Sequence, residues 1–567
     1  MPQASSPGTS WSWTVAIQFI KRLPLLAALM LAAPDPMTRG AVAPAFDDIT
    51  VTSGVVFRHY AAKTAAKLLP ETMGAGVALL DYDQDGLLDL YFVNGAASRT
   101  GSKAGTPEAN RLFRNSGDGK FSDVTNRLGL SGNGYGMGAA VGDFNGDGYP
   151  DLYVTGVGRN YLYRNNRGVS FTEVAVEAGV AGSGWSTSAV WVDYDRDGLL
   201  DLVVGRYLDW DWNKNYYCGD RKPGYRSYCH PDLWNAVPAL VFRNEGNGKF
   251  ADASVASGVA AHPGKVLGIA VDDFDQDGWP DLLFANDSAP QQFFRNSGDG
   301  RFEERGLATG VAYNGDGSLY AGMGIDAADY NRDGNPDVFI NALAQQRYAL
   351  FRNTGKLFED ETGRSGIGRL SLAHSGWGAK FADFDLDGWK DLIVAQSHVM
   401  DNIELTSPGL RYREELMLLR NRNGKFENAA AEGGPAFQRR MAARGLALGD
   451  VNNDGVLDVV VSCNDDAPRL LRGRRPEANS WLLVKLVGRK SNRDAIGAIV
   501  RLTGDGAPVQ RVYVTAGGSY LSSSDSRAHF GWIESGTKHE ITIEWPSGKV
   551  QRVPAEPRSV MRITEPE

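Results

Sequence analysis

Seven segments of the sequence place acidic side chains at one fixed spacing. Each follows the pattern D-x-[DN]-x-D-G-x-x-D, and the copies begin at Asp81, Asp143, Asp193, Asp273, Asp329, Asp383 and Asp450. Oxygens at positions 1, 3 and 5 of such a loop can converge on one point, while the glycine at position 6 permits the sharp turn that this needs. Calcium takes about six to eight oxygen ligands and tolerates irregular geometry. The spacing therefore predicts seven cation-binding segments, called the Asp loops below.

The predicted ligands are the side chains at positions 1, 3, 5 and 9 of each loop and the backbone carbonyl at position 7. They are Asp81, Asp83, Asp85, Leu87, Asp89, Asp143, Asn145, Asp147, Tyr149, Asp151, Asp193, Asp195, Asp197, Leu199, Asp201, Asp273, Asp275, Asp277, Trp279, Asp281, Asp329, Asn331, Asp333, Asn335, Asp337, Asp383, Asp385, Asp387, Trp389, Asp391, Asp450, Asn452, Asp454, Val456 and Asp458. The pattern contains no nitrogen or sulfur ligand, which disfavours zinc and copper.

Charge strengthens the case for a cation. The side-chain ligand positions hold 25 aspartates, with asparagine only at Asn145, Asn331 and Asn452. Crowded carboxylates without a cation repel one another and resist desolvation. We therefore expect calcium in most loops, up to seven ions, where it braces the fold rather than acting as a sensor. The alternative is that some loops are polar turns held by hydrogen bonds.

The elements that position these loops are short strands. A glycine-rich apolar stretch such as residues 73–80 precedes each loop, and an apolar run such as residues 88–93 follows it. A second signature, Leu112-Phe-Arg-Asn115 followed by a glycine-rich turn and Phe121, predicts a hairpin in each unit. Each unit then supplies about four strands, the content of one propeller blade. We predict an all-β protein, a seven-bladed β-propeller with a small C-terminal β-sandwich-like domain.

The chain ends predict how the ring closes. Residues 46–50 match the last strand of a unit but precede the first Asp loop, whereas the seventh unit lacks that strand after Arg472. The N-terminal strand can complete the final blade and so remove an exposed sheet edge. We expect the propeller over residues 46–476 and the C-terminal domain over residues 480–555.

These motifs resemble the FG-GAP/VCBS repeats of integrin α-subunit propellers. The arrangement is more similar still to the cartilage acidic protein family, whose members end in an ASPIC/UnbV domain. Four C-terminal segments carry that second resemblance, namely residues 491–501, 517–522, 529–531 and 543–548. The resemblance runs from Phe46 to about Val553.

Composition agrees with many short strands and tight turns, since 68 of the 567 residues are glycine, about 12% against the usual ~7%. The net charge of −9 gives no support to nucleic-acid binding. Lys21 and Arg22 precede an apolar run over residues 23–33, too short to span a bilayer, so residues 1–45 are predicted to be a signal peptide or processing segment. A buried N-terminal helix is the alternative. We expect a secreted, periplasmic or extracellular protein with no transmembrane span in the mature chain.

A long insertion interrupts the repeat between the third and fourth units. It is rich in aromatic residues, from Trp210 to Tyr228, and contains Cys218 and Cys229, whose spacing permits a disulfide. Insertions in propellers often form the binding surface, but its aromatic residues could equally pack on their own blade. Cys463 is expected to be a small buried residue rather than a nucleophile.

Other residues suggest packing rather than chemistry. His59 and residues 71–74 precede the first blade and could face the central channel, yet no nucleophile–base pair or cofactor motif accompanies them. We therefore predict neither catalytic nor cofactor-binding residues beyond the cation ligands, and favour closure and packing roles. Arg501, Arg511 and Trp545 of the C-terminal domain could form a binding face, although strand residues are more often framework.

The first functional hypothesis is a non-enzymatic platform that binds an unidentified protein or carbohydrate ligand. The alternative is an enzyme, such as a hydrolase, lyase or oxidoreductase, acting in the propeller channel or at its rim, because a fold does not determine its function.

Overall fold

The computed structural model describes residues 43–97, 101–504, 507–534 and 536–567. The predicted signal peptide lies almost wholly outside these ranges and stays a prediction. In the part of the chain so described, no helix is both long and apolar enough to cross a membrane. The described residues belong to one compact unit.

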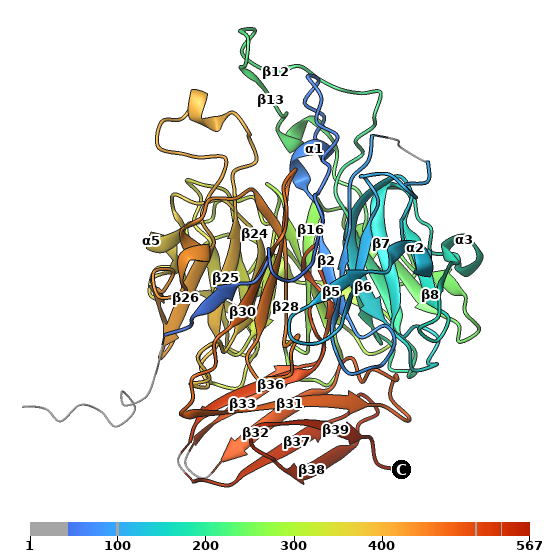
Figure 1. Ribbon diagram of the computed structural model, residues 1–567, viewed down its shortest axis with the longest axis vertical. Coiled ribbons are helices and arrows are strands. Elements are labelled where there is room, and N and C mark those ends of the chain that lie inside the picture. The colour runs from blue at the N-terminus through green and yellow to red at the C-terminus, as the bar shows by residue number, and fades with distance from the viewer. Residues whose placement is uncertain (1–42, 98–100, 505–506, 535) are drawn as a thin grey trace, which may run out of the picture. The chain divides into compact units, whose positions relative to one another are not determined.

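Most strands belong to sets of four antiparallel strands, shown from blue to orange in Figure 1. The sets are β2 (Val77–Leu80), β3 (Asp89–Phe92), β4 (Arg111–Asn115) and β5 (Phe121–Asp123); β6 (Tyr135–Gly142), β7 (Asp151–Gly158), β8 (Tyr161–Asn165) and β9 (Phe171–Glu173); β10 (Gly184–Val192), β11 (Asp201–Arg206), β14 (Leu240–Asn244) and β15 (Phe250–Asp252); β16 (Val266–Asp272), β17 (Asp281–Asn286), β18 (Gln292–Asn296) and β19 (Phe302–Glu304); β20 (Ile325–Ala328), β21 (Asp337–Ile340), β22 (Ala349–Asn353) and β23 (Phe358–Asp360); β24 (Gly376–Ala382), β25 (Asp391–Gln396), β26 (Met417–Arg422) and β27 (Lys425–Asn428); and β28 (Ala443–Gly449), β29 (Asp458–Cys463) and β30 (Arg469–Gly473) with β1 (Phe46–Asp48).

The first strands of these sets surround a common axis. Each contacts the next, from β2 through β6, β10, β16, β20 and β24 to β28, and β28 contacts β2 again. A closed ring of such four-stranded sets is a β-propeller, so the predicted fold class is confirmed. The second and third sets are also joined, because β7 pairs with β10. Seven sets appear among the described residues, one for each Asp loop, which supports the predicted blade number.

The predicted closure by the N-terminal strand is confirmed. β1 pairs antiparallel with β30, with Phe46 opposite Gly473 and Asp48 opposite Leu471. The strand is shorter than the predicted residues 46–50. Phe46 packs its ring against Phe384 and Phe437, with centroids 5.4 and 5.3 Å apart. The final blade therefore combines strands from both ends of the propeller chain, and β1 covers the outer edge of β30.

Helical segments are few and short in the part of the chain that the structure describes. They are α1 (Pro70–Met73), α2 (Thr125–Leu128), α3 (Ala175–Ala178), α4 (Gly306–Thr309) and α5 (Ile367–Ser371), with 3-10 turns η2 (Pro231–Leu233), η3 (Val259–Ala261), η4 (Ile403–Leu405) and η5 (Pro435–Gln438). In Figure 1, α2, α3 and α5 lie at the outside of the ring.

The C-terminal domain consists of two small sheets, drawn in red at the bottom of Figure 1. One contains β31 (Asn479–Val487), β36 (Ala528–Ile533) and β39 (Ser559–Thr564); the other contains β32 (Ile499–Gly504), β33 (Ala507–Tyr513), β37 (His539–Glu544) and β38 (Val550–Pro554). β39 pairs in parallel with β31, so the sheet extends beyond the predicted limit at residue 555. Its apolar core is continuous with that between the second and third blades, for example Phe530 and Val500 with Trp191.

Candidate metal centre in the Asp loops

The seven Asp loops share one backbone conformation. Glycine at position 6 has a positive φ in every copy, as at Gly86 (88°) and Gly334 (90°), which favours a residue without Cβ. The position 6 N–H donates to the carboxylate at position 1, over 3.2 Å from Gly86 to Asp81 and over 2.9 Å from Gly334 to Asp329. These hydrogen bonds turn the loop so that positions 1, 3 and 5 face one another.

In four loops, three carboxylates lie close together. One oxygen from each member of the group lies within 4.8 Å of the others. The groups are Asp81, Asp83 and Asp85; Asp193, Asp195 and Asp197; Asp273, Asp275 and Asp281; and Asp383, Asp385 and Asp387. The other three loops have asparagine at position 3, so their corresponding ligand would be an amide oxygen. The backbone carbonyls at position 7 stay predictions.

Several ligand oxygens in these loops are buried without a hydrogen-bond donor. They are Asp81 Oδ1, Asp83 Oδ1, Asp193 Oδ1, Asp385 Oδ1 and Asn452 Oδ1. A buried oxygen with no donor is costly, and most such groups in proteins have a partner. Orphaned oxygens at positions 1 and 3 of one loop fit a hard cation between them. The donor set therefore fits calcium.

The pKa values of the loop carboxylates show the cost of crowding them without a cation. Burial, followed by the charges of Asp197 and Asp195, raises the pKa of Asp193 to about 7. Burial raises the pKa of Asp273 to about 7 in the same way, in part against the hydrogen bond from Gly278. A divalent cation would reverse this by favouring the charged form.

Position 9 has a second role that the sequence did not indicate. Asp89 Oδ1 accepts the N–H of Asn115 over 2.7 Å, and its Oδ2 accepts the N–H of Tyr82 over 3.1 Å. This carboxylate therefore ties the loop to the third strand of its blade. Only in the fourth loop does position 9, Asp281, join one of the carboxylate groups described above.

Sequence reasoning also missed the arginines beside the loops. Arg114 donates to Asp83 over 2.7 Å and to Asp85 over 2.6 Å, which leaves Asp83 Oδ1 free on the inner side. Arg295, Arg352 and Arg420 make the equivalent ion pairs. All four belong to the repeated Arg-Asn pair that indicated a hairpin, so the signal was present in the sequence. They neutralise part of the loop charge from outside.

The asparagines of the same Arg-Asn pair connect neighbouring blades. Asn296 Nδ2 donates to the carbonyl of Tyr194, at position 2 of the preceding Asp loop, over 2.8 Å, and to Pro280 of its own loop over 3.1 Å. The same pair of bonds recurs around the ring, and we call the residues that form it the linking asparagines. They are Asn115, Asn165, Asn244, Asn296, Asn353 and Asn421. In the seventh blade Gly473 stands in this position.

The C-terminal domain covers the face of the propeller that carries the Asp loops. Its contacts join Lys485 to Asp81, Asp494 to the N–H of Asp143, Asn479 to the carbonyl of Asp385, and Arg527 to the carbonyl of Asp450. Arg511 forms a fully buried ion pair with Asp272, next to the first ligand of the fourth loop. The candidate metal loops therefore lie at the interface between the two domains.

A segment of the C-terminal domain fills the propeller channel. Its strands β34 (Ala516–Gly517) and β35 (Ser519–Tyr520) pair with the first strands β10 and β16, and Ser523 bridges to Ala78 of the first blade. Gly517 has a φ of 100°, and a Cβ there would lie 2.4 Å from the carbonyl oxygen of Ala189. Tyr520 is fully buried and donates its hydroxyl to the carbonyl of Met73 over 2.8 Å. We call residues 516–523 the channel plug.

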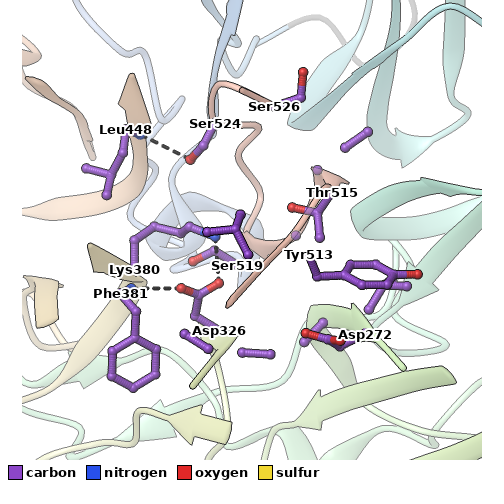
Figure 2. A pocket seen from close by; sticks show the side chains of 18 of the residues that line it. Asp272, Asp326, Lys380, Phe381, Leu448, Tyr513, Thr515, Ser519, Ser524 and Ser526 are labelled. Carbon is purple, nitrogen blue, oxygen red and sulfur yellow. Dashed lines mark hydrogen bonds and ion pairs between the residues drawn. The ribbon is translucent and has the colours of Figure 1, made fainter. Parts of the chain in front are cut away.

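A cavity of about 150 Å³ remains between the plug and the propeller (Figure 2). Charged side chains line it, but they are paired. Lys380 Nζ donates to Asp326 over 2.5 Å, and Asp326 also accepts the N–H of Phe381 over 2.7 Å. Arg511 is held by Asp272. These groups stabilise the domain interface, and the buried side chain of Arg511 agrees with the framework role favoured for it rather than with a binding face.

The remaining C-terminal candidates are also framework. Trp545 is 2% exposed, and Arg501 forms an ion pair with Glu544 of the adjacent strand over 2.8 Å. Cys463 is buried, as predicted, and burial raises the pKa of its thiol to about 12.

The His59 region packs the N-terminal segment against the last blade. His59 Nδ1 accepts the N–H of Asp465 over 3.1 Å. Glu71 accepts the hydroxyl of Thr64 over 2.6 Å, and burial raises the pKa of its carboxyl. These contacts support the closure and packing roles expected for both residues.

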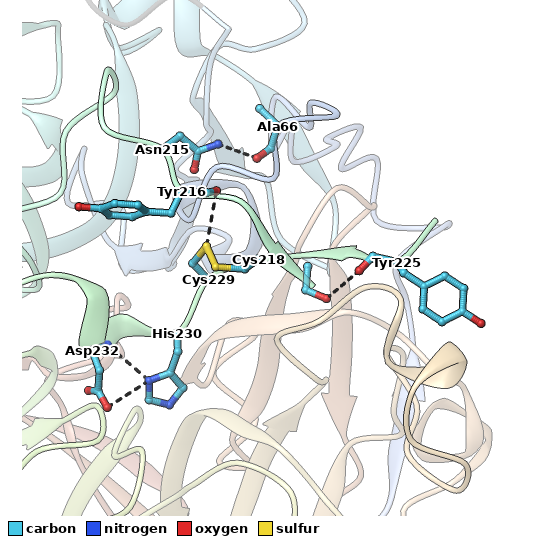
Figure 3. The surroundings of a disulfide bond; sticks show 9 residues. Ala66, Asn215, Tyr216, Cys218, Tyr225, Cys229, His230 and Asp232 are labelled. Atoms are coloured by element: carbon cyan, nitrogen blue, oxygen red, sulfur yellow. Dashed lines mark hydrogen bonds and ion pairs between the residues drawn. A yellow bond between two sulfur atoms is a disulfide. The ribbon is translucent and has the colours of Figure 1, made fainter. Parts of the chain in front are cut away.

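Cys218 and Cys229 form a disulfide in the insertion, as their spacing permitted (Figure 3). The structure divides the aromatic residues of this insertion into two groups. Trp210, Tyr228 and Trp234 are buried in a cluster that also contains Tyr520 of the channel plug. Tyr216 and Tyr217 remain 47% and 43% exposed. Packing on the propeller and an exposed surface therefore both occur, in different parts of one insertion.

Comparison with known proteins agrees with this architecture. A model of the FG-GAP-like repeat matches residues 81–154, 143–204, 273–340 and 329–394, and a model described as ASPIC and UnbV matches residues 488–567. The chain is thus a β-propeller protein with FG-GAP-like repeats and a C-terminal ASPIC and UnbV domain, which confirms the resemblance found in the sequence.

Among individual proteins, the chain is similar to cartilage acidic protein 1. It is 28% identical to the Xenopus tropicalis protein over 294 residues, 50% of this chain and 42% of that protein. Identity to the Homo sapiens protein is 26% over 310 residues, 53% of this chain and 43% of that protein. The match therefore spans less than half the length of these relatives.

Solved structures are more distant. An Agrocybe aegerita lectin described as recognising non-reducing terminal N-acetylglucosamine is 15% identical, with a TM-score of 0.39, and the match covers 68% of this chain and 85% of the lectin. BBS1N in complex with ARL6DN is 12% identical, with a TM-score of 0.41, and the match covers 76% of this chain and 97% of that chain. At these scores the likeness carries no argument about function.

Proposed function

We propose that this protein is an exported, calcium-loaded β-propeller that serves as a binding or scaffolding platform for a protein or carbohydrate ligand. Calcium is supported by the orphaned oxygens of the Asp loops, such as Asp81 Oδ1 and Asp83 Oδ1. Export is supported by the disulfide between Cys218 and Cys229, because disulfides persist in oxidising compartments.

The observation that carries the platform role is the channel plug. Propeller ligands and substrates commonly enter the central channel, but here residues 516–523 pair with its wall strands. The loop face is in turn covered by the C-terminal domain. The outer surface and the face opposite the C-terminal domain are then the surfaces available to a partner. An enzyme acting at the rim stays the alternative, whereas the plug disfavours one acting in the channel.

Calcium would act on the platform as a brace. It would be held by carboxylates at positions 1, 3 and 5, and by an asparagine in three loops. Since the loops lie under the C-terminal domain, calcium bound there stabilises both the blades and the interface. The extracellular calcium level keeps even weak sites filled, so we infer a structural rather than a signalling role.

Calorimetric titration of calcium into chelator-treated protein tests the metal assignment. We expect binding to several sites, up to seven, and a rise in Tm; magnesium, which demands near-ideal octahedral geometry, is expected to stabilise less. A Tm that is unchanged by chelation would contradict the bracing role. Capture assays with the immobilised full-length protein, against polysaccharides and extracellular proteins, test the platform role independently of calcium stoichiometry.

A further inference from the structure

The insertion ends in a small hairpin that projects away from the ring. The disulfide links β12 (Cys218–Gly219) to the chain next to β13 (Arg226–Ser227), and the two strands pair with Gly219 opposite Arg226. In Figure 1 this hairpin lies at the top, on the side opposite the C-terminal domain. We call residues 214–228 the disulfide tip.

The disulfide tip gathers positive charge around an exposed tyrosine. The guanidinium carbon of Arg221 lies 5.1 Å from the centroid of the Tyr217 ring, and that of Arg226 lies 4.9 Å from the same ring. Lys222 lies 5.8 Å from the ring of Tyr225. Within the described residues, none of these three cations forms an ion pair with a carboxylate.

Charge at the tip is locally positive. Lys214, Arg221, Lys222 and Arg226 against Asp220 give the tip a net charge of +3. An anionic partner is therefore attracted to this end of the insertion.

The two arginines offer guanidinium donors for an anion. Each lies over the Tyr217 ring, and neither pairs with a carboxylate among the described residues. Arg226 Nε is a buried donor with no hydrogen-bond partner. A sulfate or carboxylate group that reaches either guanidinium group would accept bidentate hydrogen bonds.

The tip is held in place before any ligand arrives. Asn402 Nδ2 donates to the carbonyls of Gly224 and Arg226, over 2.9 and 3.0 Å, and Asn215 Nδ2 donates to the carbonyl of Ala66 over 2.7 Å (Figure 3 shows the last contact). With the disulfide, these bonds reduce the conformational entropy that binding would otherwise remove.

We propose that the disulfide tip binds the anionic groups of an acidic polysaccharide. The proposal rests on the platform function proposed above and assigns a surface and a ligand class to it. A sulfated chain and a carboxylated chain both offer anionic oxygens that a guanidinium group can bind. The flat, half-exposed rings of Tyr216 and Tyr217 add contact area beside the charges.

Two other classes of partner fit the tip less well. A stable protein interface buries about 800 Å² on each side, more than a single hairpin end offers. Insertion into a bilayer needs large apolar side chains, and residues 219–226 contain none apart from Pro223 and Tyr225. An extended polyanion needs only a few charged contacts.

The test measures binding of the full-length protein, in calcium, to heparin and to polygalacturonate, with neutral dextran as a negative control. The probe variant is Arg221→Ser/Arg226→Ser. Its matched control is Arg301→Ser/Arg439→Ser, which removes two exposed arginines elsewhere. Circular dichroism and Tm establish that both variants fold. We expect the tip variant to bind at least about tenfold more weakly than the wild type, whereas the control should bind as the wild type does. The slope of log Kd against log salt concentration should be smaller by about two for the tip variant.

Each outcome separates this inference from the platform function. Unchanged polysaccharide binding by the tip variant would overturn the tip assignment and leave the platform function standing. Stronger tip-dependent binding to polyglutamate or to vesicles of phosphatidylglycerol than to either polysaccharide would overturn the ligand class. If the wild type binds no polysaccharide but captures another partner through a different surface, only the tip inference is overturned. If the wild type captures nothing, both the tip inference and the platform function are overturned.

Discussion

The side-chain amide of Asn353 donates a hydrogen bond of 2.7 Å to the backbone carbonyl of Phe274, a residue of the preceding blade's Asp loop. The same amide donates to Pro336 over 3.1 Å, and its oxygen accepts the N–H of Gly355 over 2.8 Å. One buried side chain thus fixes its own hairpin, its own loop and the neighbouring loop. The Asp loops and the contacts between blades are therefore mechanically connected.

Replacing Asn353 by alanine should destabilise the propeller by about 2–4 kcal/mol, because two buried carbonyls lose their donor. Urea unfolding measures the change. Asn247→Ala is the matched control, since Asn247 accepts one hydrogen bond in an exposed hairpin turn, and it should cost less than about 0.5 kcal/mol. Equal stability of the two variants would contradict the linking role.

Asp193→Asn should affect stability in opposite directions with and without calcium. In chelator the variant should be as stable as the wild type or slightly more stable, because it removes a buried charge beside Asp195 and Asp197. In calcium it should be less stable; a tenfold weaker site removes about 1.4 kcal/mol of stabilisation. Thermal unfolding under both conditions provides the measurement.

The control for that experiment is Asp299→Asn, an exposed aspartate in a hairpin turn outside the loops. It should change neither the calcium stoichiometry nor the difference in Tm between the two conditions. If Asp193→Asn behaved like this control, the third loop would be a polar turn rather than a calcium site.

Tyr520→Ala should loosen the channel plug. Tyr520 is fully buried, and its ring lies 5.0 Å from that of Trp377, so the truncation should cost about 3–5 kcal/mol. Tyr520→Phe keeps the ring and loses only the hydrogen bond to Met73, with an expected cost of about 1 kcal/mol. Denaturant unfolding and limited proteolysis of residues 514–525 would measure both. If Tyr520→Ala resisted the protease as well as the wild type does, the position of the plug would not depend on the Tyr520 side chain.

His59 should contribute to acid lability. Burial and nearby cations lower the pKa of His59 to about 3, whereas the unfolded chain titrates near its ordinary value of 6.5. The unfolded state therefore takes up a proton as the pH falls below about 6.5, and the folded state does not. Stability supplied by the neutral histidine is complete at pH 7 and declines by about 2 kcal/mol by pH 5.

The variant His59→Asn tests this sign, because its Oδ1 can accept the N–H of Asp465 without titrating. Urea unfolding at pH 7 and pH 5, in calcium, should show a smaller loss for the variant than for the wild type. His398 and His529 are also buried, and their pKa values are lowered to about 4 and about 3. The variant should therefore still lose some stability at pH 5. An identical pH response of variant and wild type would exclude the assignment.

Much of the fold could be predicted from local sequence patterns. The D-x-[DN]-x-D-G spacing defined the loops because a carboxylate converges with its neighbours through a turn of a few residues. Residues 46–50 indicated how the ring closes. They match the last strand of a unit but precede the first unit, and the seventh unit lacks that strand. The convergence of carboxylates at positions 1, 3 and 5 followed in the same way, for example at Asp81, Asp83 and Asp85.

Long-range contacts decided the rest. Nothing in the sequence around Tyr520 places it inside the propeller. For Arg511 the sequence left a binding face and a framework role open, and only its partner Asp272, far away along the chain, shows that it is framework. Asn353 looked like a hairpin residue because its contact with Phe274 crosses between blades. Sequence alone determined the repeated, locally folded unit; only the tertiary structure decided which surfaces the units and the C-terminal domain bury against each other, because that burial depends on residues hundreds of positions apart.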